Sequence, residues 1–454
     1  MENIERYKRL LKHTFIDYQQ TAEIVKSPLI FTKAEGLYLW DINGKKYFDA
    51  IGGIFVACLG HRHPKVMEAM KKQMGRLTLA PSLHGISDVG LEFVEKLGSV
   101  TPGNLNFIKG FSGGSESIEA AMKFARQYFK QTGKPEKYKF IGNYLSYHGG
   151  TFATMSASGI GEKIKFEPQM PGFLKILSPL QLRDKFSSWE KANRFCAQMF
   201  EDVIISENPD TIAAVLLEPI CNTGGIITPT EEYFRIIRET CHKYNVMLIF
   251  DEVLTGFGKT GDMFCAQTFN VIPDIICAGK ALSSGAMPIG AIMVREDYAD
   301  AFYGEPGIQF SHGHTYANNP LASAVGIAVI NELQEQKLPQ KARKTGAYLL
   351  KRLEDIKNKY GVIREIRGKG VLRGIELVQD TSTLKPFPEG NKLGTELKKT
   401  SVNNGLILRI NPDWFAVAPP LIAKESDIDE MCNLIDKSLK EALDIVNNKR
   451  LRCC

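Results

Sequence analysis

The chain has 454 residues, more than one ordinary domain holds, and this length predicts two or three domains. Its 44% hydrophobic and 24% charged residues are typical of a globular protein in water. The net charge of +6 is spread along the chain and forms no basic stripe interleaved with aromatic residues, which argues against nucleic-acid binding.

The first residues, "MENIERYKRLLKHTF", have a charged helical pattern and lack the apolar core of a secretion signal. No apolar run approaches the roughly 20 residues that cross a bilayer, so we expect no membrane segment. The nine cysteines show no CxxC spacing and indicate reduced thiols in a cytoplasmic protein. Two of them, Cys453 and Cys454, end the sequence; we expect a frayed tail there, with a metal or redox role as the alternative.

The first predicted elements form a hairpin and a helix. Strand-like pieces flank Asn43-Gly44 in "GLYLWDINGKKYFDAIGGI", and this dipeptide predicts a tight hairpin turn. The stretch "HPKVMEAMKKQM" predicts a helix with Pro64 near its start.

From about residue 105, strand-like and helical patterns alternate. The strand-like runs are "LNFIKGFS", "YKFIGNYLS", "TIAAVLLEP", "VMLIFDEV", "DIICAG" and "IGAIMVR". Helical periodicity marks "SESIEAAMKFARQYF", "TEEYFRIIRETCHKY" and "NPLASAVGIAVINELQEQ". Several strands are apolar almost throughout, as expected when helices cover both faces of a sheet. The alternation predicts an α/β domain with a mostly parallel central sheet flanked by helices.

After about residue 335 the pattern changes to that of a smaller α+β unit. The predicted elements are a charged helix over 338–359, the strand pair "IREIRGKGVLRGIELV", a helix over 391–402, the strands "GLILRI" and "WFAVAPPLI", and the helix "DIDEMCNLIDKSLKEALDIV". The N-terminal hairpin is expected to join this unit, because neither piece has an adequate core alone. We therefore predict a small domain built from 1–62 and 331–454 around a large domain, 63–330.

Lys280 is the first candidate functional residue. It ends the apolar run "DIICAG" and lies among small or apolar residues, where a lysine loses its proton more easily and becomes a nucleophile. The alternative is a surface lysine whose stem lies along apolar neighbours.

Other strand ends also carry polar residues, and in a parallel sheet these ends meet at one edge. Asp251 can hold a cationic ring nitrogen or a metal, or can cap a turn. Glu218 ends the run "VLLE" in the same way. Tyr147 can stack on a flat ligand or pack in the core. His148 can polarise a ligand oxygen or make a structural hydrogen bond.

A glycine-rich turn precedes the helix that begins near Ser115. The stretch "SGGSE", with Gly114 and Ser115, offers free backbone amides for a phosphate, and an ordinary helix cap is an equal alternative. A second match, "GFGKTG", fits GxGxxG, but it starts five residues after Asp251 and opens no periodic helix. A nucleotide-dependent oxidoreductase is therefore the weaker alternative.

Together these residues call for one ligand that has a flat ring, a ring nitrogen, a phosphate and a carbonyl that condenses with lysine. Pyridoxal 5′-phosphate has all four, with Asp251 keeping the ring nitrogen protonated and Lys280 forming the Schiff base.

The sequence resembles the class III pyridoxal-phosphate aminotransferases, the ω-aminotransferase group of fold type I. The resemblance runs from about Gly36 to the last helix, and the motifs that carry it include "LGHRHP", "FSGGSESIEAAMKFAR", "SYHGGT", "LLEPI", "IFDEVLTGFGKTG", "PDIICAGKALSSG", "HGHTYANNPLASA" and "RGKGVLRGIEL". It implies the fold type I transferase fold.

Carried over to this sequence, the family pattern makes Lys280 and Asp251 catalytic. The residues that it implies for cofactor binding are Gly114, Ser115, Tyr147, Asp251, Val253, Lys280 and Thr315, with Glu218 near the cofactor's ring substituent or a substrate-side arginine. His148, proposed above from the residues alone, joins the cofactor-binding candidates. Thr315 would reach the phosphate of a neighbouring subunit, which implies a homodimer with active sites at the interface. The substrate residues are Phe55, Tyr147 and Arg409, with Arg409 holding the acceptor's carboxylate or, alternatively, being a surface strand arginine.

The resemblance implies a ping-pong Schiff-base mechanism that moves an amino group from an amine or ω-amino acid to a keto acid, pyruvate or 2-oxoglutarate. Leu254 replaces a glutamine that is common in relatives, which argues mildly against an ornithine- or 4-aminobutyrate-type enzyme. The alternatives are a decarboxylase, an aminomutase or a racemase on the same fold, and a non-catalytic binding protein. The donor amine and its stereochemistry stay open.

Overall fold

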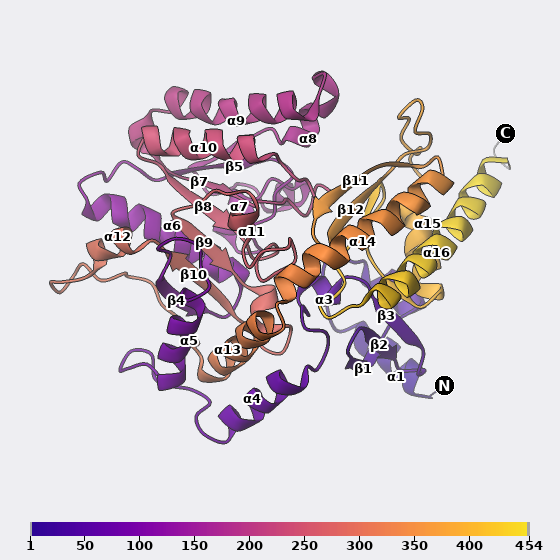
Figure 1. Ribbon diagram of the computed structural model, residues 1–454, viewed down its shortest axis with the longest axis horizontal. Coiled ribbons are helices and arrows are strands. Elements are labelled where there is room, and N and C mark those ends of the chain that lie inside the picture. The colour runs from indigo at the N-terminus through magenta and orange to yellow at the C-terminus, as the bar shows by residue number, and fades with distance from the viewer. Residues whose placement is uncertain (1, 452–454) are drawn as a thin grey trace.

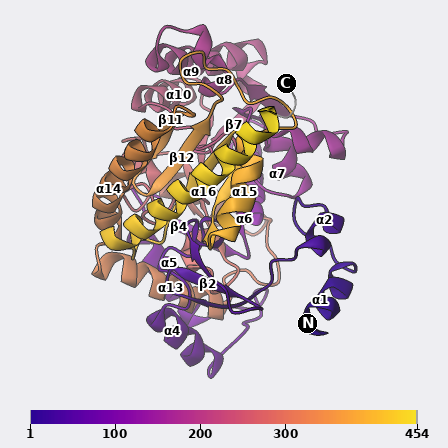
Figure 2. The ribbon, with the colours of Figure 1, turned by 90° about the vertical axis from the view of Figure 1, so that its right-hand side faces the viewer.

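The computed structural model describes residues 2–451, so Cys453 and Cys454, whose role the sequence left open, lie outside the described residues. The chain starts with α1 (Glu2–Leu11) and α2 (Thr21–Lys26), which stand away from the body of the molecule (Figure 2). Within the described part of the chain, no helix combines the length and the apolar character needed to cross a membrane.

The predicted N-terminal hairpin is present. Strands β1 (Phe31–Glu35), β2 (Tyr38–Asp41) and β3 (Lys46–Asp49) form an antiparallel meander. The turn between β2 and β3 is stabilised by Asp41, whose Oδ1 accepts the N–H groups of Asn43 and Lys45, each at 2.9 Å. Strand β3 also pairs in parallel with β13 (Leu406–Ile407), so the two ends of the chain share one four-stranded sheet.

A seven-stranded sheet, the central sheet of the larger part of the molecule, lies at the left in Figure 1. In spatial order its strands are β4 (Phe107–Phe111), β10 (Gly290–Val294), β9 (Ile275–Ala278), β8 (Met247–Asp251), β7 (Ile212–Leu217), β5 (Lys139–Asn143) and β6 (Phe173–Ile176). Only β10 runs antiparallel to its neighbours, which confirms the mostly parallel sheet. The edge strand β6 was not predicted.

Helices cover both faces of this sheet. Successive residues of a strand point to opposite faces of the sheet, so each strand contributes to two cores. Val215 and Leu248 pack in the core beneath α5, α9, α10 and α13, whereas Leu216 and Ile249 pack in the core beneath α6. The longer helices of this part are α4 (Pro64–Met74), α5 (Asp88–Gly98), α6 (Gly114–Gln131), α9 (Trp189–Ser206), α10 (Glu231–Lys243) and α13 (Pro320–Glu335). The short helices are α3 (Gly52–Phe55), α7 (Phe152–Ala157), α8 (Pro179–Leu182), α11 (Cys265–Thr268) and α12 (Glu296–Ala299). The 3₁₀ turns are η1 (Gly161–Phe166), η2 (Arg183–Lys185), η3 (Pro209–Thr211), η4 (Lys280–Ser283) and η5 (Asp300–Phe302).

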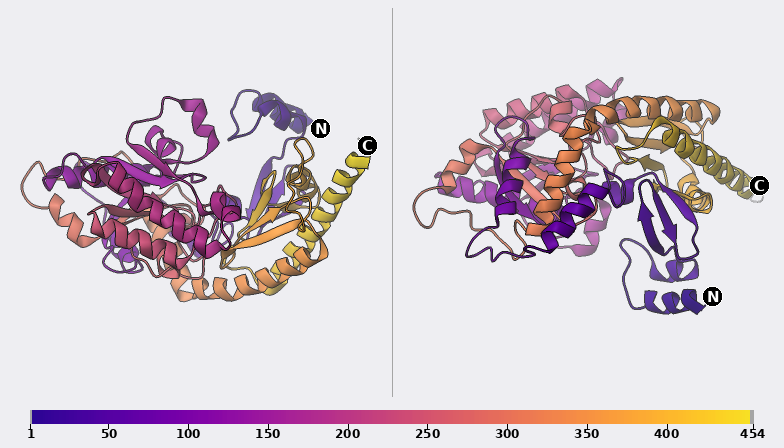
Figure 3. Two further views of the ribbon diagram at one scale, coloured as in Figure 1. Left: turned by 90° about the horizontal axis from the view of Figure 1, so that it is seen from above. Right: turned by 60° about the horizontal axis from the view of Figure 1, so that its bottom comes forward.

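The C-terminal part forms a third sheet beside the large one (Figure 3). It is antiparallel, with β11 (Ile363–Lys369), β12 (Leu372–Leu377), β15 (Trp414–Val417) and β14 (Arg409–Asn411) in that order. The helices α14 (Leu338–Lys359), α15 (Leu393–Asn403) and α16 (Glu425–Leu451) accompany it. One hydrophobic core joins Phe48 of the hairpin to Leu353 and Phe415.

One detail differs from the sequence expectations. The single strand predicted at "GLILRI" is divided at Leu408, because β13 pairs with the hairpin and β14 pairs with β15. Helix α13 ends at Glu335, as the pattern "NPLASAVGIAVINELQEQ" predicts. The division into 1–62, 63–330 and 331–454 stays a prediction.

Candidate active site

The strands β4, β5, β7, β8 and β9 all end at the same edge of the central sheet. Neighbouring strands match there: Asp251 at the end of β8 pairs with Cys277 of β9, and Gly290 at the start of β10 pairs with Phe111 at the end of β4. The polar residues that the sequence places after these strands therefore lie along one edge.

Lys280 lies at this edge, two residues after β9. Its backbone is left-handed (φ 40°), a conformation that costs a non-glycine residue about 1–3 kcal/mol. Burial lowers the pKa of Lys280, while the charges of Asp251 and Glu218 oppose the shift. Among the described residues its amine has no hydrogen-bond partner, so it is available to a ligand at this edge.

Asp251 and His148 form a buried pair. His148 Nδ1 lies 2.8 Å from Asp251 Oδ2, and Asp251 Oδ1 accepts the N–H of Val253 at 3.1 Å. The His148 N–H donates to Ser158 Oγ at 2.8 Å, which fixes the histidine backbone. Asp251 thus has a fixed orientation and a negative charge that can face a cation. His148 Nε2 is buried without a partner in the described residues, so the pair has an unused polar atom.

Glu218 supports the neighbouring loop. Its Oε1 accepts the N–H of Tyr147 at 2.8 Å, and its Oε2 accepts the N–H of Asn222 at 3.2 Å. Burial raises the pKa of Glu218 to about 6; His148 opposes this shift and Asp251 adds to it. The sequence analysis did not predict these hydrogen bonds to backbone amides, because Glu218 and Tyr147 are 71 residues apart in the chain.

Small residues bring the start of α6 close to the ends of β8 and β9. A Cβ atom built on Gly114 would lie 2.8 Å from Val253 Cγ1, and one on Gly279 would lie 3.4 Å from the same atom. Ser115 Oγ accepts the N–H of Gly150 at 3.2 Å. The space beside the Cα of Gly113 is open, and no side chain caps this helix. Its first amides can therefore bind a phosphate.

Tyr147 contacts a residue that the sequence did not single out, and Arg409 lies near Trp414. The hydroxyl of Tyr18, which lies between α1 and α2, donates to the Tyr147 hydroxyl at 3.4 Å. Burial lowers the pKa of Arg409, and the charges of Glu162 and Tyr18 oppose the shift. The Arg409 guanidinium lies 5.8 Å from the centre of the Trp414 ring. No local pattern marked Tyr18, because it lies in an irregular segment.

In the described residues, no side-chain hydrogen bond joins Phe55 or Thr315 to this cluster. Phe55 is buried, and its segment packs on the turn after Lys280: Cys58 Sγ donates to the carbonyl oxygen of Ala281 at 3.3 Å. Thr315 is exposed in a turn.

The cluster fits each part of pyridoxal phosphate. Lys280 supplies the unpartnered amine, and Asp251 supplies the oriented carboxylate. The uncapped amides at Gly114 and Ser115 suit the phosphate, and the close approach of Gly114 to Val253 shows that larger residues would fill this space.

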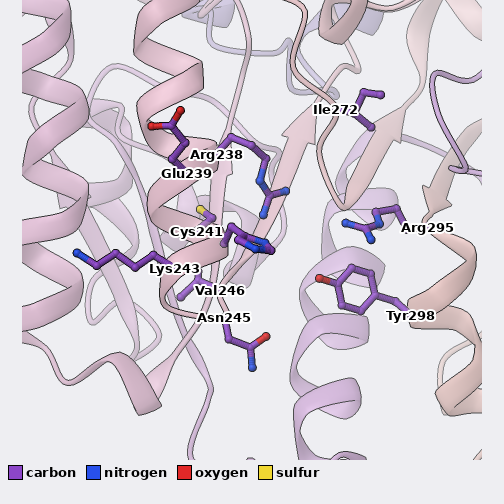
Figure 4. A pocket seen from close by; sticks show the side chains of 10 residues that line it. Arg238, Glu239, Cys241, Lys243, Asn245, Val246, Ile272, Arg295 and Tyr298 are labelled. Carbon is purple, nitrogen blue, oxygen red and sulfur yellow. The ribbon is translucent and has the colours of Figure 1, made fainter.

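A cavity and a glycine-rich segment also lie near the central sheet, but neither belongs to the cluster. A cavity of about 500 Å³ lies at the opposite edge of the sheet, lined by residues that include Arg238, Cys241, Arg295 and Tyr298 (Figure 4). Both arginines are ion-paired to the buried Asp274, at 2.9 and 3.0 Å, which gives them a structural role.

The GxGxxG match, residues 256–261, lies in turns, and the next helix, α11, starts only at Cys265. This geometry does not fit a dinucleotide fingerprint, in which the glycines open a helix.

Comparisons with known proteins identify the family of the chain. Residues 20–439 match the family model described as aminotransferase class-III. The chain is 32% identical over 439 residues to a putrescine–pyruvate aminotransferase of Pseudomonas aeruginosa, covering 94% of this chain and 93% of that protein. An (S)-enantioselective ω-transaminase from Thermomicrobium roseum superposes with a TM-score of 0.92 at 32% identity, covering 97% of this chain and 98% of that one. The ω-transaminase of Pseudomonas jessenii in complex with PMP superposes with a TM-score of 0.91 at 30% identity, covering 97% and 98%.

Proposed function

The chain belongs to the class III aminotransferases, and we propose that Lys280 carries their reaction here. The protein is a pyridoxal phosphate-dependent aminotransferase of fold type I, which moves an amino group from an amine or amino acid to a keto acid. The observation that carries the proposal is the unpartnered, partly buried amine of Lys280 at the sheet edge that also holds Asp251.

The residues that would hold the cofactor surround this amine. Asp251 would bind the ring nitrogen, with His148 fixing the carboxylate, and Val253 and Tyr147 would enclose the two faces of the ring. Gly114 and Ser115 would hold the phosphate, and Glu218 would support the loop of Tyr147. When bound, pyridoxal phosphate supplies an electron sink for the charge that develops on the donor carbon.

Lys280 performs two tasks in turn. Because its pKa is lowered, a larger fraction of the amine is neutral and can attack a carbonyl. With the cofactor bound, the same Nζ would act as the base that takes a proton from the donor carbon and as the acid that returns it to the cofactor. The first carbonyl product leaves before the keto acid enters, so the kinetics are ping-pong.

Arg409 is proposed to bind the carboxylate of the acceptor. Support comes from its half-buried position, where the charges of Glu162 and Tyr18 act on its pKa, and from the hydrogen bond of Tyr18 to Tyr147. A planar guanidinium suits a carboxylate because it can donate two parallel hydrogen bonds. Phe55 and Tyr147 are proposed to shape the pocket of the donor chain.

We propose a homodimer in which Thr315 completes the phosphate site of the partner. Thr315 is exposed, as are large apolar side chains close to it in the sequence. Large apolar side chains are also exposed between α4 and α5, where Leu83 is 94% exposed, and an interface between subunits would cover them. A solution mass equal to that of one chain would contradict this proposal. A cytoplasmic location is also proposed, which the free cysteine thiols favour.

A donor-by-acceptor assay tests the function. The purified protein, loaded with pyridoxal phosphate, is mixed with diamines, ω-amino acids or arylalkyl amines and with pyruvate, and alanine is measured. We expect alanine with at least one donor and parallel double-reciprocal plots. Release of carbon dioxide or an isomerised amino acid, without alanine from any donor, would identify another reaction on this fold.

The same assay tests Arg409. In Arg409→Leu we expect the KM for pyruvate to rise about 10- to 100-fold, because charge-assisted hydrogen bonds are lost. The KM of a monoamine donor should stay the same. Equal changes in both KM values would contradict the assignment.

A further inference from the structure

The segment after Glu218 folds into a closed loop, residues 221–227, which contacts the Tyr147 segment. Cys221 and Ile227 exchange backbone hydrogen bonds at 2.9 and 2.8 Å, which closes the loop. Cys221 Sγ donates to the carbonyl oxygen of Leu145 at 2.8 Å, and the hydroxyl of Thr223 donates to the same oxygen. The position of this loop therefore affects both Glu218 and the backbone that precedes Tyr147.

The second domain holds this loop through one buried arginine. Arg367 on β11 is 6% exposed, and its Nε and Nη2 donate to the carbonyl oxygen of Gly225 at 3.1 and 3.0 Å. The packing is tight: a Cβ on Gly225 would lie 3.0 Å from Arg367 Nη2, and one on Gly374 would lie 2.5 Å from the Gly225 oxygen. The loop has little room to shift relative to β11 and β12.

Arg367 is itself held by an ionic network. It donates to Glu376 on β12, and Arg183 of the large domain donates to both oxygens of Glu376 at 2.8 and 2.9 Å. Burial would raise the pKa of Glu376, but the two arginines lower it to about 2. Glu376 thus stays ionised and keeps the Arg367 side chain oriented toward the loop.

We propose that Arg367 is a positioning residue of the active site: by holding the Gly225 carbonyl, it keeps loop 221–227 in place and Glu218 hydrogen-bonded to the Tyr147 backbone. The kinetic consequence of this inference rests on the proposed function, whereas the position of the loop does not depend on it.

The chain offers a matched control. Arg364 lies on the same strand and belongs to the same ionic network, with Nη1 3.3 Å from Asp184 Oδ2 and 3.7 Å from Glu376 Oε1. In the described part of the chain its hydrogen bonds and ion pairs are with Asp184 and Glu376, and none reaches loop 221–227. Lysine at either position keeps the positive charge, whereas only Arg367→Lys removes the two-pronged contact with Gly225.

Hydrogen–deuterium exchange of the holoenzyme tests the position of the loop. We expect Arg367→Lys to speed exchange in peptides that cover residues 145–150 and 218–227, including the Tyr147 amide, and Arg364→Lys to leave them at the wild-type rate. Unchanged exchange in Arg367→Lys, or an equal increase in both variants, would overturn the inference. This result does not depend on any activity, so it remains decisive if the wild type fails to make alanine and the proposed function itself fails.

The pH profile of kcat/KM gives the catalytic readout. His148, Asp251, Lys280 and Cys221 surround Glu218, and burial keeps its pKa raised to about 6. A looser loop admits water, which lowers that pKa, and weakens the hydrogen bonds from the Tyr147 and Asn222 amides, whose loss raises it. Because burial is the largest cause of the shift, the acidic limb of the Arg367→Lys profile should move to lower pH, with kcat reduced roughly tenfold. Arg364→Lys should keep the wild-type limb. A lower melting temperature with an unchanged limb and kcat would show that Arg367 is only structural, which overturns the inference.

Discussion

Replacing Lys280 with alanine is expected to lower the rate of alanine formation at least about 1,000-fold, because one amine serves as both nucleophile and proton carrier. A second readout is independent of turnover. After borohydride treatment of the wild-type holoenzyme, the peptide that contains Lys280 should carry the mass of the reduced cofactor, and no other lysine peptide should. Added methylamine should restore a small part of the activity of Lys280→Ala.

Lys259 provides the matched control for this experiment. It is another buried lysine, and burial lowers its pKa to about 8. Its Nζ donates to the carbonyl oxygen of Gly256 at 3.3 Å and so has a structural partner. Lys259→Met should lose thermal stability but keep turnover per folded molecule. Cofactor mass on the Lys259 peptide, or full activity in Lys280→Ala, would refute the assignment of Lys280.

Asp251→Asn is the second change with a large expected effect. Without the carboxylate, nothing keeps the ring nitrogen protonated, and His148 loses its charged partner. We expect kcat to fall roughly 100- to 1,000-fold, while Asp251→Glu, which keeps the charge, should lose less. Turnover is measured on protein whose fold has been checked by circular dichroism and whose cofactor content has been determined.

The variant Asp274→Asn is the control that distinguishes an effect on catalysis from the general effect of removing a buried charge. It too is a buried carboxylate of this sheet region, but it lies at the opposite edge, where it pairs with Arg238 and Arg295 and accepts the N–H of Leu248 at 2.7 Å. Asp274→Asn should destabilise the fold and leave kcat of the folded fraction within about twofold. An equal loss of kcat in both variants would show that the Asp251 effect is not chemical.

The sequence predicted the central sheet because local patterns determine it. Apolar runs marked β7, β8 and β9, and the polar residue after each run located Glu218, Asp251 and Lys280 at one edge. Helix α14 was predicted with the bounds that the structure has, because its periodicity is long and charged.

The elements that could not be predicted depend on contacts between distant segments. Strand β6 is short, is partly exposed and carries Lys175, so its pattern does not resemble a buried strand. The strand is interrupted at Leu408 because the residues before it pair with β3 and the residues after it pair with β15, in two different sheets. The contact of Arg367 with Gly225 joins residues 142 positions apart and has no local signal.

The pairing of β3 with β13 has a consequence for how the protein is made. Strand β3 leaves the ribosome early, but Leu406, the partner of Phe48, is synthesised roughly 350 residues later. Until then the edge of β3 that pairs with β13 stays uncovered. At a synthesis rate of about 5–20 residues per second, the uncovered edge persists for roughly 20–70 s. During this time the nascent hairpin presents unpaired backbone groups that can pair with another chain. The need for protection by chaperones therefore falls on the first 50 residues, far from the catalytic lysine.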